Sequence, residues 1–105
     1  MAEPTPRMRQ IEALLADDPH DEFLRYGLAM EHAGQGDEAT AVSQLLALTD
    51  DRPYVPAFLQ AGQMLARLGR EPEAIDVLKR GIVVAKQQND THAAGEMEGF
   101  LAGLA

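Results

Sequence analysis

Residues 33–45 read AGQGDEATAVSQL, and residues 66–78 read ARLGREPEAIDVL. The two segments share identical residues at one constant separation, which we call the repeat offset: Ala33 and Ala66, Gly36 and Gly69, Glu38 and Glu71, Ala41 and Ala74, Leu45 and Leu78, with Val42 matched by Ile75. Similarity at a fixed period of this size is typical of stacked two-helix units, each of which buries its apolar face against a neighbour. The repeat therefore predicts an all-α fold that offers extended surface, which favours a binding scaffold over a catalytic pocket.

The composition agrees with packed helices in a single domain spanning residues 1–105. Apolar residues make up 46% of the chain and aromatic residues 5%, and tryptophan and cysteine are absent. Without cysteine, disulfides, thiolate metal sites and cysteine nucleophiles are excluded. The core must therefore be built mainly from Leu, Ala, Ile, Val and Met.

Charge and hydropathy narrow the possible partners. The net charge is −8, and phosphate contacts require a basic surface, so a nucleic-acid partner is not expected. No segment approaches the ~18 consecutive apolar residues of a membrane span. We expect a soluble, cytoplasmic protein with no membrane partner.

Proline, glycine and acidic residues divide the chain into six predicted helices. Prolines after Asp18 and Arg52 push those two residues out of the α region, and the glycines at 34, 36 and 69 favour helix ends. The predicted helices cover residues 5–16, 20–33, 38–49 and 54–68, then a fifth with Pro72 in its first turn that reaches about 88, and a last helix after a cap within residues 89–91. No segment alternates apolar and polar residues as a strand would.

The second half of the chain resembles the tetratricopeptide repeat, a helix-turn-helix unit of about 34 residues. The positions that match in the second unit are Phe58, Ala61, Gly62, Leu65, Gly69, Ala74 and Leu78. The first unit matches at Leu28, Ala29, Gly36, Ala41, Leu45 and Pro53, but Arg25 and His32 replace its aromatic residues. The resemblance covers about residues 8–88.

The first helix resembles the second half of such a unit. Ile11, Leu14, Asp17 and Pro19 precede Leu45, Leu48, Asp51 and Pro53 by a constant separation, one position longer than the repeat offset. The resemblance therefore implies a right-handed stack of antiparallel helix pairs, an α-α superhelix. Its parts would be a half-repeat helix at 5–18, units at 20–53 and 54–88, and a capping helix at 90–105.

Small residues recur where neighbouring helices must approach closely. They are Ala29, Ala41, Gly62 and Ala74, and larger apolar residues such as Leu45 and Leu78 fill the space between them. Short side chains let helix axes come close, and the larger ones interlock. These four positions predict the seam within each helix pair.

The register of the first unit has two readings. Phe23-x2-Tyr26-Gly27-x2-Met30 fits the first-helix pattern by residue type, but it requires two extra residues in the following turn. The register that aligns Leu28 with Ala61 keeps the distances of the second unit, and we prefer it. In that register Phe23, Tyr26 and Met30 turn toward the concave face formed by the first helices.

The resemblance implies a non-catalytic adaptor whose concave groove receives a peptide or a helix of a partner protein. The predicted groove residues are Phe23, Tyr26, Met30, Leu59, Gln60, Gln63 and Arg67. The aromatic residues and the methionine would anchor an apolar side chain, the glutamines would bond the ligand backbone, and the arginine would pair with a carboxylate.

Two alternatives stay open at this stage. Phe23, Tyr26 and Met30 can instead be ordinary core residues or lie under the last helix, as such stripes often do. The apolar face can also serve self-association, so that the protein is a monomer or a homodimer.

Catalytic and metal sites are not expected. His92 and Glu96 share a helix face, but a lone pair four residues apart is typical of a surface contact. The acidic segment 17–22 fits a capped turn better than a cation site. We predict no enzyme activity, no cofactor and no bound metal.

Overall fold

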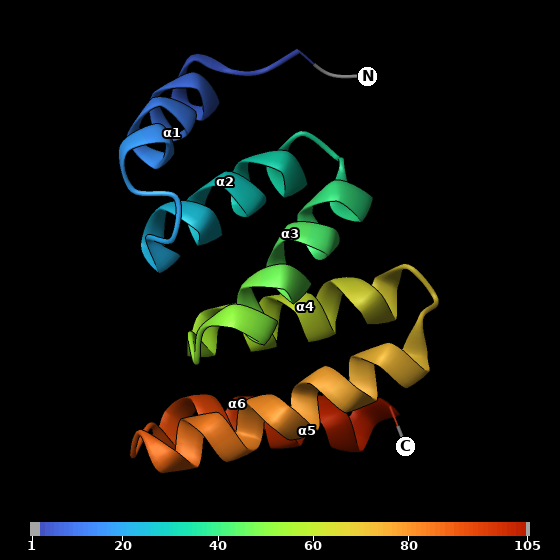
Figure 1. Ribbon diagram of the computed structural model, residues 1–105. Helices are drawn as coiled ribbons and strands as arrows, with labels where there is room; N and C mark the ends of the chain where they lie inside the picture. The colour runs from blue at the N-terminus through green and yellow to red at the C-terminus, as the bar shows by residue number, and fades with distance from the viewer. Residues whose placement is uncertain (1–2, 105) are drawn as a thin grey trace. The chain divides into compact units, whose positions relative to one another are not determined.

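The computed structural model describes residues 3–104, and the regular secondary structure in that range is entirely α-helical. Figure 1 shows the helices in order: α1 (Pro6–Asp17), α2 (Glu22–Gly34), α3 (Glu38–Asp51), α4 (Val55–Arg67), α5 (Glu71–Gln87) and α6 (Thr91–Leu104). The predicted all-α helical repeat is confirmed.

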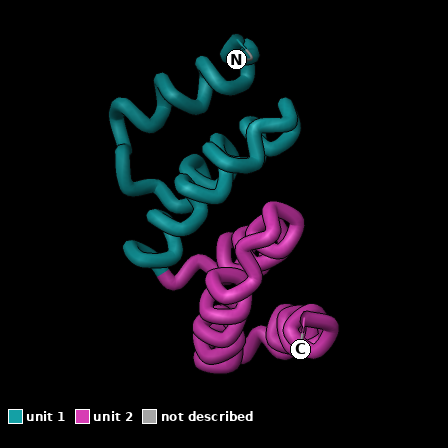
Figure 2. Tube along the Cα trace, turned by 90° about the vertical axis from the view of Figure 1, so that its right-hand side faces the viewer, with its two compact units in different colours: residues 1–52 teal, residues 53–105 magenta. Residues whose placement is uncertain are grey.

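The chain folds into two compact units that divide between Arg52 and Pro53, coloured separately in Figure 2. In the first unit α1 packs on α2, and α2 packs on α3. In the second, α4 packs on α5 and α5 on α6, with a smaller contact between α4 and α6. The division lies one residue before the predicted boundary between the repeat units, and the predicted single domain with a half unit at 5–18 and a cap at 90–105 stays a prediction.

Side-chain caps fix where the helices of the first unit begin. Thr5 and Asp21 accept hydrogen bonds from the backbone N–H groups of Met8 (3.1 Å) and Leu24 (2.8 Å), so α1 and α2 begin one residue after each cap. The predicted starts at residues 5 and 20 were therefore one and two residues early, because a cap satisfies helical N–H groups while staying outside the helix. Asp37 caps α3 as predicted, accepting from Thr40 N–H at 3.2 Å.

The helix ends follow proline in two cases. Asp18 and Arg52, each preceding a proline, have φ of −141° and are not helical. The third helix nevertheless continues to Asp51, two residues beyond its predicted end at 49, because the proline excludes the α conformation only for the residue directly before it. Smaller shifts of one residue occur at the ends of α1, α2, α4 and α5.

Three turns share one conformation that needs a positive φ. Gly36 (φ 85°), Gly69 (φ 76°) and Asn89 (φ 59°) follow α2, α4 and α5. In each case the next residue's N–H bonds a carbonyl five residues back: Asp37 to His32 at 3.0 Å, Arg70 to Leu65 at 2.8 Å and Asp90 to Ala85 at 2.8 Å. This pattern satisfies helix carbonyls that would lack partners, and the left-handed residue favours glycine or asparagine.

The four predicted seam residues, Ala29, Ala41, Gly62 and Ala74, are buried, whereas Leu14 is exposed and Ile75 is only half-buried. In the first unit the buried residues are Met8, Ile11, Ala29, Ala41, Val42, Leu45, Leu48 and Thr49. In the second unit the buried apolar residues are Val55, Ala57, Phe58, Ala61, Met64, Leu65, Ala74, Val77, Leu78, Ala85, Ala94 and Met97. Each fully buried leucine or phenylalanine contributes about 1.5–3 kcal/mol relative to exposure, so these stripes supply most of the packing free energy.

Two glycines set the spacing of helices in the second unit. A Cβ atom added at Gly62 of α4 would lie 2.5 Å from Leu78 Cδ2 of α5. A Cβ atom at Gly81 of α5 would lie 2.5 Å from Phe58 Cβ of α4 and 2.7 Å from Met97 Sδ of α6. Gly62 was predicted as a seam residue, whereas Gly81 was not.

Candidate protein-interaction surface

Helix α2, the first helix of the first repeat, carries apolar side chains that unit 1 does not bury completely. Phe23, the second residue of α2, is 70% exposed, and Tyr26 and Met30 are half-buried. Positions three, four and seven apart lie on one side of a helix. Ala29, three residues after Tyr26, is fully buried, so this apolar stripe borders the packed side of α2 and Phe23 is its most exposed member.

The spacing of the helices agrees with the register that aligns Leu28 with Ala61. Helices α2 and α4 begin at Glu22 and Val55 and end at Gly34 and Arg67, so both pairs of ends are separated by the repeat offset. The left-handed glycines that follow them, Gly36 and Gly69, have the same separation. The other register would need two extra residues in the first of these turns.

A polar link joins α2 to the end of α3. Arg25 Nη1 donates to Asp51 Oδ2 at 2.6 Å, and His20 Nδ1 lies 3.7 Å from the same oxygen. The hydrogen bond from Arg25, aided by the nearby positive charges, lowers the pKa of the Asp51 carboxyl below its usual 3.8. Arg25 stands where the family pattern has an aromatic residue, and its role here is this link.

The first helix of unit 2 presents a more polar stripe. Leu59, Gln60 and Gln63 are half-buried, and Arg67, the last residue of α4, is exposed. The other side of α4 packs on α5 through Phe58 and its neighbours. Within each unit the predicted site residues therefore share one helix, and the groove that would join the two sets stays a prediction.

Unit 1 also contains a small hollow that the sequence did not suggest. It has a volume of about 200 Å³ and is lined by Leu15, Arg25, Leu28, Gln44 and Ala47. In the described part of the chain, the buried Oε1 atom of Gln44 has no hydrogen-bond partner. The one sequence signal is that Gln44 precedes Val77 by the repeat offset, so a polar residue replaces a core residue of the second unit.

The candidate polar clusters have structural roles. His92 Nε2 lies 2.8 Å from Glu96 Oε1 on the exposed surface of α6, the predicted contact between residues four apart. In the acidic segment 17–22, Asp21 caps α2. Between residues 3 and 104 no group of three or more His, Cys, Asp or Glu side chains is placed to hold a metal ion.

The length and hydropathy of the helices can be compared with those of a membrane span. Over residues 3–104, no helix combines the length and the apolar character that crossing a bilayer requires.

Comparison with known proteins identifies the fold. No protein-family model and no curated protein matches the chain. The chain is similar to the crystal structure of a tetratricopeptide repeat domain protein from Salinibacter ruber, with a TM-score of 0.75 and 29% sequence identity over 80% of this chain and 94% of that one. Such folds generally mediate protein–protein interaction. The similarity, together with the internal repeat and the matched turns, shows that this chain has a tetratricopeptide-repeat fold.

Proposed function

We propose that the chain is a non-catalytic protein-interaction module that binds a peptide or helix of a partner along the first helices α2 and α4. The observation that carries the proposal is the exposure of Phe23, 70%, beside the half-buried Tyr26 and Met30. Burying such an aromatic side chain contributes strongly to binding, because it removes a large apolar area from water at low entropic cost. In this role the protein acts as a cytoplasmic adaptor.

The two stripes suit different parts of a ligand. Phe23 on α2 offers an apolar anchor, while Gln60 and Gln63 on α4 offer amide groups that both donate and accept hydrogen bonds. Arg67 at the end of α4 suits a carboxylate. We therefore expect preferred ligands to combine a large apolar side chain with an acidic group.

The test uses a peptide selected from a random display library against the wild-type protein. Phe23→Ala is expected to raise its Kd about tenfold or more, because truncating an aromatic anchor typically costs over 1 kcal/mol. Val83→Ala is the matched control, since Val83 is an exposed apolar residue on α5, outside the proposed ligand surface. Equal affinity of the two variants for the peptide would exclude α2 from the binding surface.

A photo-crosslinker gives an independent readout. Benzoylphenylalanine in place of Phe23 is expected to cross-link the selected peptide, whereas the same group in place of Val83 is not. Cross-linking from position 83 alone would place the ligand on another face.

Self-association through the same apolar face is the second candidate, and the same exposure of Phe23 favours it. Light scattering separates the two functions. A stable dimer that Phe23→Ala converts to a monomer would replace the adaptor proposal with this one. A mass that Phe23→Ala leaves unchanged would exclude it.

A further inference from the structure

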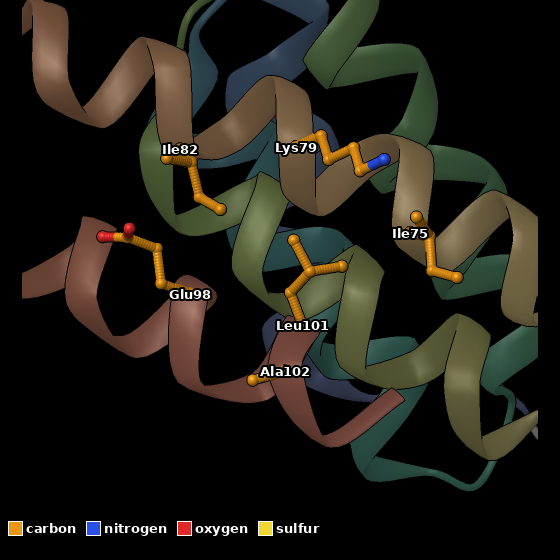
Figure 3. A pocket seen from close by; sticks show the side chains of 6 residues that line it. All are labelled: Ile75, Lys79, Ile82, Glu98, Leu101 and Ala102. Atoms are coloured by element: carbon orange, nitrogen blue, oxygen red, sulfur yellow. The ribbon is translucent and has the colours of Figure 1, made fainter. Parts of the chain in front are cut away.

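A mostly apolar groove lies between α5 and α6 in the second unit. Its volume is about 490 Å³, and it is lined by Ile75, Lys79, Ile82, Glu98, Leu101 and Ala102. Figure 3 shows that the first three side chains come from α5 and the last three from α6, with Leu101 directed into the space between the helices. The groove shares no residue with the proposed ligand surface on α2 and α4.

The groove occupies the place where a second helix would pack on α6. Counted from the first residue of each helix, Glu98 is the eighth residue of α6, as Gly62 is of α4 and Ala29 is of α2. In the complete second unit, the eighth residue faces Leu78 of the second helix α5. Helix α6 thus has the position of a first helix, and within unit 2 no second helix lies beside it.

The α5 side of the groove also indicates that a neighbouring helix is missing there. Ile75 and Ile82 follow Val42 and Thr49 of α3 by the repeat offset. Val42 and Thr49 are buried, whereas Ile75 and Ile82 are only half-buried. This face of α5 therefore leaves partly exposed two apolar side chains whose counterparts in α3 are buried.

Helix α1 has no first helix of its own within unit 1. It carries the register of a second helix, since Ile11 and Leu14 correspond to Leu45 and Leu48 of α3. Ile11 is buried, but Leu14 is 55% exposed, whereas Leu48 is fully buried. Within unit 1, α1 packs on α2, and in this arrangement Leu14 and Arg7 stay exposed.

We propose that α1 of a second copy of this chain docks into the α5–α6 groove, so that the two half units form one composite helix pair. The chain then associates head to tail, through two different surfaces, one in each unit. This inference does not depend on ligand binding by α2 and α4.

Charge supports the proposed contact between α1 and the groove. The two complete units have small residues at the eighth position of the first helix and at Ala41 and Ala74 of the second helix. The corresponding residues of the half units are Glu98 and Arg7, whose side chains are 53% and 69% exposed. In the composite pair they fall about one helical turn apart, roughly 5.4 Å along the axis, within reach of an arginine side chain.

Each of the two charges already has a distant intramolecular neighbour. Arg7 Nε lies 3.5 Å from Glu31 Oε2, and Lys86 Nζ lies 3.8 Å from Glu98 Oε2. Exposed pairs at such distances contribute little. Docking of a second copy can therefore recruit Arg7 and Glu98 without breaking a strong contact.

The proposed contact joins two different surfaces, so linked copies either form an open chain or close into a ring, the smallest of which is a dimer held by two reciprocal contacts. Each copy carries a net charge of −8, and the resulting repulsion is reduced at physiological ionic strength, where the Debye length is about 8 Å. Sedimentation velocity at this ionic strength, over a range of concentrations, is the suitable measurement.

The decisive experiment blocks one end of the chain at a time. Leu14→Glu blocks α1, and Ile75→Glu blocks the groove, so each variant alone is expected to sediment as a monomer. Mixed in equal amounts, they are expected to form a heterodimer and nothing larger, because each supplies the surface that the other lacks. Val83→Glu is the matched control, since Val83 is 55% exposed like Leu14, and it should grow as the wild type does.

Two results would overturn the proposal. One is a wild type that stays monomeric at every concentration. The other is a mixture of Leu14→Glu and Ile75→Glu that remains monomeric, with circular dichroism confirming that both variants are folded. Phe23→Ala should leave the association unchanged, which separates it from the proposed ligand surface.

A charge exchange tests the register of the composite pair. Arg7→Glu and Glu98→Arg are each expected to weaken the association constant severalfold, because each places like charges together. The double variant should recover most of the loss. If the double variant is as weak as the sum of the single changes, the two residues do not meet and the proposed register is wrong.

Discussion

Gly81 occupies the point in the second unit where α5 meets both α4 and α6. Replacement by alanine would bring a Cβ atom within 2.5 Å of Phe58 Cβ and 2.7 Å of Met97 Sδ. Overpacking of this kind costs ~1–3 kcal/mol, which equals or exceeds the ~1 kcal/mol that alanine gains over glycine in helix propensity. We expect Gly81→Ala to lower the free energy of unfolding by about 1 kcal/mol, as measured by urea denaturation.

Gly99 of α6 provides the matched control. It is exposed, and a Cβ atom added there would meet no atom within 4 Å. Gly99→Ala should therefore raise the free energy of unfolding by about 0.5–1 kcal/mol through propensity alone. If both substitutions stabilise the protein, the close approach at Gly81 is not a constraint on packing.

Gly81 shows why the sequence predicts some close contacts and not others. Ala29 and Gly62 were recognised because small residues recur at the repeat offset. Gly81 corresponds to Leu48 in the first unit, so the repeat gives no signal there. Its partner Met97 lies in α6, a helix without a preceding counterpart of the same residue pattern, and the need for a glycine arises only from that contact.

At the scale of the elements, the sequence predicts six helices because their boundaries are local chemistry. Proline acts on the residue before it, glycine permits a left-handed turn, and aspartate caps the helix that follows. The errors were of one or two residues, as at Asp21, which had to be assigned to either the helix or the cap. The choice depends on whether its side chain bonds Leu24 N–H, which residue type alone does not determine.

Acid stability should depend on carboxylates at the helix boundaries. Hydrogen bonds from Thr40 lower the pKa of Asp37, Arg25 lowers that of Asp51, and Arg70 lowers that of Glu73, from ordinary values of 3.8, 3.8 and 4.5. A carboxyl with a lowered pKa in the folded state stabilises the protein above its unfolded pKa, and the contribution is lost as the pH falls through the folded pKa. We expect the free energy of unfolding to fall steadily below about pH 4.

Asp37→Asn isolates one of these groups. Asparagine is as good a helix N-cap as aspartate, so stability at neutral pH should change little, whereas the slope of stability against pH below about 4 should become shallower. Urea denaturation at several pH values measures both quantities. An acid limb identical to that of the wild type would show that the Asp37 carboxylate is not linked to folding.

At the scale of the whole molecule, the repeat predicts the fold better than it predicts the surfaces. The seven predicted site residues fall on α2 and α4 as expected for first helices, because their helical spacing is visible in the sequence. The α5–α6 groove was not predicted, since Ile75 was matched to Val42 as a packing residue of the repeat. Its exposure depends on how α6 packs beside α5, which the repeat does not predict.

Helix α1 should open more readily than the central pair of the second unit. It contributes two buried residues, Met8 and Ile11, whereas α4 contributes seven. Local opening is cheapest where few apolar contacts are lost. In dilute solution we expect amide hydrogens of α1 to exchange at least tenfold faster than those of α4, a ratio that hydrogen exchange with mass spectrometry resolves.

Protein concentration then becomes a second variable in the same measurement. If α1 of one copy docks against α5 and α6 of another, a folded helix gains contacts without any change in its sequence, and its opening becomes less favourable by mass action. Protection of α1 should therefore rise with protein concentration in the wild type, and it should stay constant in Leu14→Glu. Equal protection of α1 and α4 in dilute solution would contradict the first expectation, and a wild-type α1 whose exchange ignores concentration would contradict the second.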